Sequence, residues 1–232
     1  MIQMRRAGDR GRFDFGWLDT RHTFSFGEYH DPAWSGFSVL RVLNEDRVLP
    51  GQGFGMHGHR DMEILSWVLE GAIEHRDSLG NGEVLRPGEI QRMSAGTGIR
   101  HSEFNPSADS PLHFLQIWIV PDAPGGAPAY EQRLVDPGRL DGTFAPVASP
   151  DGREGSVRIR QDATLSIARL KPGADVSIGI GAARNSWVQV SRGSVGTAGE
   201  VVSAGDGLAV REEIRLDFRA LEDSEILVFD LP

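Results

Sequence analysis

The chain contains no cysteine among its 232 residues. This absence excludes disulfide bonds, thiolate metal ligands and cysteine nucleophiles, so any bound metal ion must be held by nitrogen and oxygen atoms. Long apolar runs are also missing, because no stretch approaches the roughly 18 to 20 apolar residues that span a bilayer. The opening MIQMRRAGDRGRF lacks the apolar core of a signal peptide. We therefore expect a cytoplasmic protein that makes no use of a membrane.

Positive charge is in short supply, since 24 basic residues stand against 33 acidic ones and give a net charge of −9. Such a chain repels a phosphate backbone unless a local basic stripe compensates. The densest basic cluster, MRRAGDRGR at the start, is interrupted by Asp9. We expect no nucleic-acid partner. The sequence leaves the oligomeric state open, and a monomer is compatible with it.

The glycines and prolines, 29 and 13 in number, are spread along the whole chain and separate short apolar segments. This alternation of short apolar segments and turn residues is typical of an all-β protein, and no long stretch has a helical period. Turn signals such as SLGNGE and LKPGAD have the spacing of a sandwich or barrel. The clearest strands are expected at 37–43, 63–71, 112–120, 186–190 and 225–231.

The sequence also contains a weak internal repeat, with an offset of about half the chain. Its landmarks recur in the same order: Trp67 and Trp187, Gly71 and Gly193, and the turns PGE (87–89) and AGD (204–206). This predicts two small β-barrels in tandem.

The segment between the two copies, 120–155, is rich in proline and glycine and is the natural linker. Within it, APAYEQRL is compatible with a short helix. We expect one barrel over residues 1–135 and a second over residues 136–232.

Histidine is absent from residues 114–232, so an imidazole-based metal site can lie only in the first barrel. His57 and His59 lie ten and eight residues before Trp67. The residues at the same distances before Trp187 are Ser177 and Gly179. The second barrel is therefore expected to have no metal site.

His57 and His59 are two residues apart, so on a strand both side chains point to one face and can reach one ion. Two solvated histidines on an exposed strand would give the same pattern. His101 and Glu103 follow a glycine-rich turn with the same spacing. If the two pairs face each other, they supply three nitrogens and one carboxylate and leave room for water or a substrate.

Glu63 competes with Glu103 for the carboxylate position, because it shares the strand parity of the first histidine pair. Periodicity does not choose between the two glutamates. The alternative role for Glu63 is a supporting one, such as an ion pair that orients a ligand histidine.

The remaining histidines are poorer ligand candidates. His113 begins an apolar strand and is expected to be a hydrogen-bonded core residue, whereas His75 lies in a charged hairpin and is expected to be solvated. His22 and His30 flank an aromatic-rich segment, where packing is the simpler role.

Several motifs together resemble a known family. GQGFGMHGHRDMEILSWVLEG (51–71) resembles the first cupin motif, and GIRHSEFN (98–105) resembles the end of the second. With WLDTRHTFSFGEYHDP, MSAGTGIRHSEFNPS and LHFLQIWIVP, the chain resembles the pirin family of bicupins, some bacterial members of which are described as quercetin 2,3-dioxygenases.

This resemblance implies an all-β bicupin with two jelly-roll cupin barrels in tandem and one metal ion in the N-terminal barrel. The ligands it implies are His57, His59, His101 and Glu103. Pirins take the carboxylate from the second motif, so the resemblance gives Glu63 a supporting role. Such a ligand set accepts Fe, Mn, Co, Ni, Cu or Zn, and iron is our first expectation.

The activity that the resemblance implies is a metal-dependent dioxygenase, which opens the heterocyclic ring of flavonols such as quercetin with O2 and releases CO. The substrate's 3-hydroxyl would approach the metal as an oxyanion, with Glu103 as ligand and as general base. Two alternatives remain: a regulatory pirin that binds a protein partner in a metal-dependent way without turnover, and a cupin with a purely structural metal. Aromatic residues that could line a pocket for a flat substrate, although core packing is the simpler expectation, are Phe24, Phe26, Trp34 and Phe54.

Overall fold

The computed structural model describes residues 1–232 and contains twenty-two β-strands, four short 3₁₀ helices and no α-helix. The predicted all-β class is therefore confirmed. None of the helical segments has the length and apolar character needed to cross a membrane. The chain folds into two compact units, which we call the N-terminal unit (residues 11–134 and 157–161) and the C-terminal unit (residues 1–10, 135–156 and 162–232).

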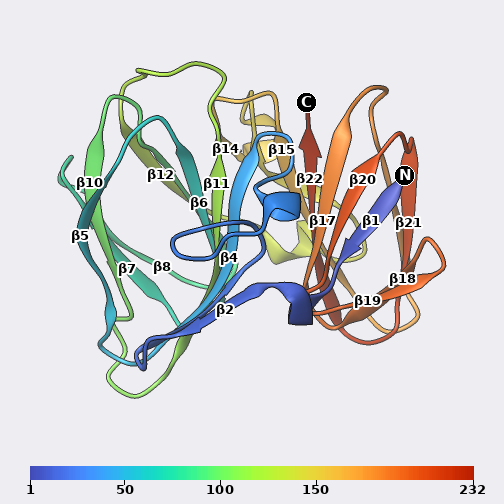
Figure 1. Cartoon of the computed structure of the whole chain (residues 1–232), viewed down its shortest axis with the longest axis horizontal. Coiled ribbons are helices and arrows are strands. Elements are labelled where there is room, and N and C mark those ends of the chain that lie inside the picture. The colour runs from blue at the N-terminus through green and yellow to red at the C-terminus, as the bar shows by residue number, and fades with distance from the viewer. The chain divides into compact units, whose positions relative to one another are not determined.

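The N-terminal unit is built from two antiparallel sheets (Figure 1). The larger sheet has the strand order β12–β9–β6–β11–β4–β3–β2, and the smaller one has the order β5–β10–β7–β8. The strands are β2 (Gly11–Asp14), β3 (Leu18–His22), β4 (Leu40–Val48), β5 (Gly53–His59), β6 (Glu63–Glu70), β7 (Ile73–Asp77), β8 (Gly82–Leu85), β9 (Glu89–Ser94), β10 (Ile99–Phe104), β11 (Leu112–Ile119) and β12 (Ala129–Leu134). The short β14 (Val157–Arg158) also falls within this unit but is not a strand of either of its sheets.

The apolar core of the N-terminal unit is supplied by strands that are apolar on both parities, as β6 and β11 are in the sequence. Such strands are expected where both faces of a sheet are covered. Trp67 on β6 and Phe114 on β11 are fully buried, and Phe114 packs with Leu18, Val68 and Ile73. The sheet wall opposite β5 and β10 is thus held rigidly by packing.

The C-terminal unit has the same plan. Its larger sheet includes the order β1–β20–β17–β22–β15–β13, and its smaller sheet has the order β16–β21–β18–β19. The first strand of the chain pairs with β20, and the blue N-terminal ribbon lies beside the orange β20 in Figure 1. The strands are β1 (Ile2–Arg5), β13 (Ala145–Ser149), β15 (Thr164–Leu170), β16 (Asp175–Gly179), β17 (Asn185–Arg192), β18 (Ser194–Thr197), β19 (Glu200–Ser203), β20 (Gly207–Arg211), β21 (Arg215–Ala220) and β22 (Ser224–Leu231).

The landmarks of the sequence repeat occupy equivalent places in the two units. Trp67 and Trp187 are both fully buried on β6 and β17, each of which lies between corresponding neighbours in its larger sheet. Gly71 and Gly193 follow these strands with φ of 76° and 71°, in the left-handed region that favours glycine. The two units are therefore structural copies of one another.

The segment expected to be a linker contains two strands, β12 and β13, and the helix considered for APAYEQRL does not form. Instead Ala129–Leu134 pairs along its whole length with β9. A short segment with no strong helical period is stabilised more by pairing with the edge of a sheet than by forming an isolated helix. The division of the chain into two domains at residue 135 stays a prediction. Residues 1–10 lie in the C-terminal unit and residues 157–161 lie in the N-terminal unit, so both segments depart from a simple division at that point.

The inward-facing positions of β16 differ from those obtained by counting back from Trp187. Ser177 and Gly179 are exposed, whereas Val176 and Ile178 pack against the apolar core of the C-terminal unit. The count is therefore wrong by one residue, and a one-residue slip exchanges the two faces of a strand. The inward residues at this place are aliphatic and have no metal-binding atom.

Candidate metal centre

Three of the predicted ligands come together on the smaller sheet of the N-terminal unit. His57 and His59 lie on β5 and His101 lies on the neighbouring β10, directly opposite His57. Their ring centroids are 4.8 Å (His57–His59), 4.5 Å (His57–His101) and 4.9 Å (His59–His101) apart. One ligand atom from each lies within 4.8 Å of the others. This spacing brings three imidazole nitrogens within reach of one ion.

A bulge in β5 helps to aim these side chains. Two steps along β10, from His101 to Glu103, correspond to three along β5, from His57 to Phe54, so β5 contains one extra residue. Bulges of this kind re-aim side chains and are frequent beside functional sites. Within the bulge, Nδ1 of His57 lies 2.7 Å from the carbonyl oxygen of Gly55. Because a carbonyl only accepts, Nδ1 carries the hydrogen, and Nε2 is left for a metal ion.

His101 lacks the hydrogen bonds that usually hold a buried structural histidine. Its side chain is fully buried, yet neither ring nitrogen has a hydrogen-bond partner. Burying an unpaired polar nitrogen is unfavourable, and coordination of a metal ion would satisfy it. Burial, reinforced by the neighbouring imidazoles, lowers the pKa of His101 to about 3 and that of His59 to about 4. At neutral pH both rings are therefore unprotonated and have a lone pair available for a metal.

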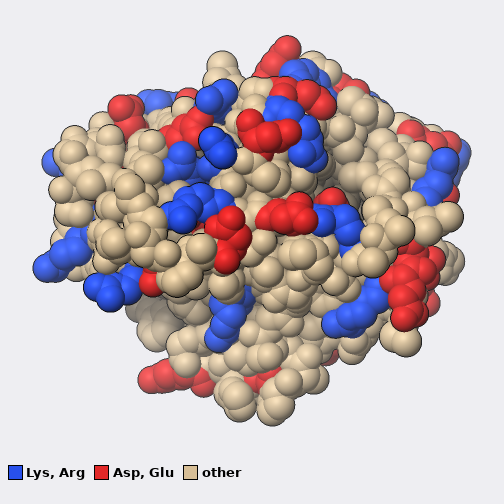
Figure 2. All heavy atoms as spheres, turned by 90° about the horizontal axis from the view of Figure 1, so that it is seen from above, with Lys and Arg blue, Asp and Glu red and all other residues tan.

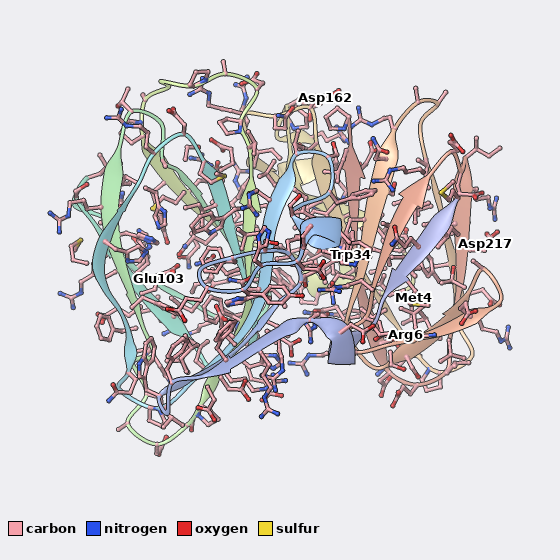
Figure 3. The ribbon with its side chains drawn as sticks, viewed as in Figure 1. Met4, Arg6, Trp34, Glu103, Asp162 and Asp217 are labelled. Atoms are coloured by element: carbon pink, nitrogen blue, oxygen red, sulfur yellow. The ribbon has the colours of Figure 1, made fainter.

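Glu103 is buried between the two sheets, where Figure 3 labels it, and it belongs to a second group of ligand atoms with His75 and His101. Its Oε2 accepts a hydrogen bond from Nε2 of Gln116 at 2.8 Å. Its Oε1 accepts weaker ones from Gln91 at 3.3 Å and Ser66 at 3.4 Å. These donors come from three strands of the larger sheet and hold the carboxylate in one orientation.

Glu63 has different partners. It is buried on β6, where the hydroxyl of Ser94 donates to its Oε2 at 2.8 Å. Burial raises the pKa of this carboxyl, against the opposing effects of Ser94, Arg92 and Arg160. Neither group of clustered ligand atoms includes Glu63. Its contacts indicate a structural carboxylate within the larger sheet.

Replacing the two glutamates separately tests which one binds the metal. We expect Glu103→Gln to weaken metal binding by about 10-fold to 100-fold or more, because the neutral amide is a poorer ligand for a cation. Glu63→Gln is the matched control and should keep the metal. Metal content per chain after dialysis measures both. Retention of metal by Glu103→Gln together with its loss from Glu63→Gln would reverse the assignment.

The prediction for His75 is wrong, because this side chain is fully buried rather than solvated. It stacks on Tyr130, with ring centroids 4.5 Å apart, and its Nε2 lies 3.2 Å from Oδ2 of Asp77. The charged neighbours in the hairpin suggested exposure, but His75 has the parity of Ile73, which faces the core. That parity is the signal that could have placed it inside. The expectation for His113 holds, since its Nε2 is 2.9 Å from a carboxylate oxygen of Glu45.

A cavity of about 340 Å³ opens beside the histidine cluster, within the range of roughly 300 to 1,000 Å³ that is usual for small-molecule sites. His57, His59 and Glu103 all contribute to its lining. Aromatic rings dominate the rest of the wall: Phe13, Phe15, Phe26, Phe54 and Trp118. Trp118 packs edge to face with both His59, at a centroid distance of 4.9 Å, and Phe26, at 5.3 Å.

Of the four aromatic residues considered from the sequence, Phe26 and Phe54 line this cavity. Phe24 and Trp34 are buried and are not part of its lining, which agrees with a packing role. The polar part of the lining, above all Asn44 and Asp46 on β4, was not predicted from the sequence. Both have the inward parity of strand Leu40–Val48, so polar residues where apolar ones are expected were the available signal.

Asp46 is nearly completely buried, and this burial raises the pKa of its carboxyl to about 7.

The surface of the molecule carries charges of both signs. On the face shown in Figure 2, Lys and Arg side chains are interspersed with Asp and Glu.

Comparisons with known proteins agree with this architecture. Residues 3–119 match the family described as Pirin, and residues 146–231 match the family described as the quercetinase C-terminal cupin domain. A quercetin 2,3-dioxygenase of Escherichia coli strain K12 is 50% identical over 232 residues, which cover 100% of this chain and 99% of that protein.

Two solved structures are similar over the whole chain. The crystal structure of YhhW from Escherichia coli has a TM-score of 0.96 at 50% identity and covers 100% of this chain and 98% of its own. The structure of the bacterial pirin YhhW from Escherichia coli in complex with nickel(II) has a TM-score of 0.95 at 50% identity, covering 100% and 99%. A family model matches each half of the sequence, and half of the positions are identical to those of a relative that the chain covers almost completely. The chain therefore belongs to the pirin family of bicupins.

Proposed function

We propose that this protein is a metal-dependent dioxygenase, which opens the heterocyclic ring of flavonols such as quercetin with O2 and releases CO. The observation that supports this most directly is a cluster of three imidazoles, two of which line an aromatic cavity together with Glu103, a carboxylate close to the third imidazole, His101. The quercetin 2,3-dioxygenase of Escherichia coli, at 50% identity, gives the substrate class.

The residues that would hold the metal ion are His57, His59, His101 and Glu103. They fit a divalent transition metal, because the donor set is N₃O and the buried His101 has no other partner for its ring nitrogens. When bound, such an ion would supply Lewis acidity toward the substrate hydroxyl and a redox centre for dioxygen.

Glu103 is the group that we assign to accept the proton of the substrate's 3-hydroxyl. A general base must lie within hydrogen-bond reach of the proton it removes, and this carboxylate contributes to the cavity wall. The hydrogen bond from Gln116 fixes Oε2 in place. It is the shortest of the three hydrogen bonds to this carboxylate, so Gln116 contributes most to positioning the base.

The aromatic wall of the cavity would hold the flat rings of a flavonol. Trp118 and Phe26 meet edge to face, which leaves ring faces and edges available for stacking with a ligand. Burial between these rings also excludes water from a reactive ring system during its oxidation. The same wall would favour planar aromatic compounds over sugars or amino acids.

Iron is the ion that we propose for this protein, with Mn, Co, Ni, Cu and Zn as competitors, because an N₃O donor set does not select strongly among them. Nickel(II) is the ion named for the pirin YhhW complex. Metal analysis of protein purified without added metal, followed by reconstitution with each ion separately, determines which one supports oxygen uptake.

Aerobic turnover of quercetin tests the proposed function. We expect metal-loaded protein to consume O2 and release CO in equal amounts, and metal-free protein to do neither. Oxygen uptake and CO capture by a haem protein measure the two gases independently. If metal-loaded protein consumes no oxygen with quercetin or with a panel of other flavonols, the enzymatic proposal fails for this substrate class. A non-catalytic role would then have to explain the site.

A further inference from the structure

A polar patch lies in the cavity on the sheet opposite the histidines. It consists of Thr20 and His22 on β3 and Asn44 and Asp46 on β4, and all four line the cavity. The strands pair so that Thr20 faces Asp46 and His22 faces Asn44. All four side chains are nearly completely buried, with 2% to 6% of their surface exposed. We call this group the β3–β4 patch.

The β3–β4 patch retains hydrogen-bonding capacity that the fold does not use. Oδ1 of Asn44, Oδ1 of Asp46 and Nδ1 of His22 are buried and have no hydrogen-bond partner. Leaving three such atoms unpaired in one place is unfavourable, and native structures rarely do so without a functional reason.

A neighbouring polar residue shows the contrast. Gln116 on β11 lies opposite Asn44, and its amide donates to Glu103 while its carbonyl accepts from Ser66. The fold therefore satisfies the polar group beside the proposed metal ligand, whereas in the β3–β4 patch Oδ1 of Asn44 and Oδ1 of Asp46 keep a free acceptor site although the hydroxyl of Thr20 interacts with the carboxyl of Asp46.

The cavity places this patch and the histidines on different walls. His57 and His59 belong to the smaller sheet, whereas Asn44 and Asp46 belong to the larger one, and aromatic rings complete the lining. A flat ligand that presents one hydroxyl to the histidines can therefore present others to the β3–β4 patch.

We propose that Asn44 and Asp46 bind hydroxyl groups of the aromatic ligand, so that the cavity selects polyhydroxylated flavonols over sparsely hydroxylated ones. The ligand class rests on the proposed function. The amide oxygen of Asn44 accepts a hydrogen bond, and an Asp46 carboxyl that titrates near neutral pH can accept or donate one. A site built to pair with hydroxyls rejects ligands that lack them, because its own polar groups then stay unpaired.

Equilibrium binding to the metal-free protein without oxygen tests this selection. The probes are 3-hydroxyflavone, which has one hydroxyl, galangin, which adds two on the fused ring, and quercetin, which adds two more on the pendant ring. We expect affinity to rise at least about tenfold along this series, since a tenfold change corresponds to one or two hydrogen bonds. Asp46→Ala and Asn44→Ala should each remove most of that rise and leave 3-hydroxyflavone binding nearly unchanged.

Glu45→Gln is the matched control, because Glu45 lies between these two residues on β4 but does not line the cavity. It should keep the order of affinities. An equal loss for all three probes in the alanine variants, an unchanged order in them, or no binding of any flavonol would each overturn the proposal. If a variant fails to fold, the wild-type series still decides, since equal affinity for the three probes contradicts the selection.

The outcome can be separated from that of the proposed function. A hydroxyl-dependent order of affinities without turnover by the metal-loaded protein would overturn the dioxygenase and leave the selective subsite. Turnover with equal affinity for the three probes would overturn only the subsite.

Discussion

Substitution of His101 by alanine is expected to weaken metal binding by at least about 100-fold and to remove any metal-dependent activity. Even residues that merely orient a ligand contribute about 10-fold to 100-fold to metal affinity, and His101 is proposed as a ligand itself. Its ring lies within 4.5 Å and 4.9 Å, between centroids, of the other two imidazoles. Without it, two imidazoles and one carboxylate remain. Metal content by mass spectrometry and competition with a chelator of known affinity measure the loss.

His30→Ala is the control for this experiment, because His30 is exposed and is not part of either cluster of ligand atoms. It should bind metal as the wild type does. A full equivalent of tightly bound metal in His101→Ala would show that this residue is not a ligand. Circular dichroism of the variant separates loss of the site from loss of the fold.

Gly193→Ala is expected to lower the free energy of unfolding by about 2 to 5 kcal/mol. Left-handed backbone costs a non-glycine residue about 1 to 2 kcal/mol, and overpacking adds about 1 to 3 kcal/mol. Gly193 has a φ of 71°, and a methyl group there would overlap the carbonyl oxygen of Asp223 and the side chain of Ser224. Urea denaturation of the two proteins measures the difference.

Gly173→Ala separates the two contributions. Gly173 has a φ of 81° in the same unit, but nothing lies within 4 Å of a methyl group built on it. It should lose only the backbone part, about 1 to 2 kcal/mol. Equal losses in the two variants would mean that the close approach of Asp223 is not important. The corresponding residue of the repeat, Gly71, is in the same position against the backbone of Pro111 and Leu112.

The five clearest strands could be predicted because their apolar runs are long enough to fill a central place in a sheet. The segments at 63–71 and 112–120 became β6 and β11, neighbours in the middle of the larger sheet. The edge strand β12 shows why other strands were missed. Ala129–Leu134 has no strong pattern of its own and is a strand only because β9 offers it a free edge.

The histidine pair at 57 and 59 could be assigned to one face because strand geometry is local. Local strand geometry does not determine whether that face points into the barrel or toward solvent. For this reason the predictions for His75 and for Ser177 were wrong. His75 shares with Ile73 the face of β7 that the barrel covers, but which face is covered depends on the pairing of β7 with β10 and β8. The same holds for the β3–β4 patch, where parity gives the shared face and tertiary structure decides that this face lines the cavity.

By itself the sequence determined the all-β class, the tandem repeat, the N/O character of any metal site and the restriction of an imidazole-based site to the first half of the chain. Each follows from composition, from local periodicity or from the order of recurring landmarks. Only the tertiary structure decided that His57 lies opposite His101, that Glu63 is bonded to Ser94 and that Asn44 and Asp46 line the cavity. These depend on the pairing and register of strands far apart in the chain. Many distant pairings suit one pattern of apolar residues, and only packing of the whole barrel selects among them.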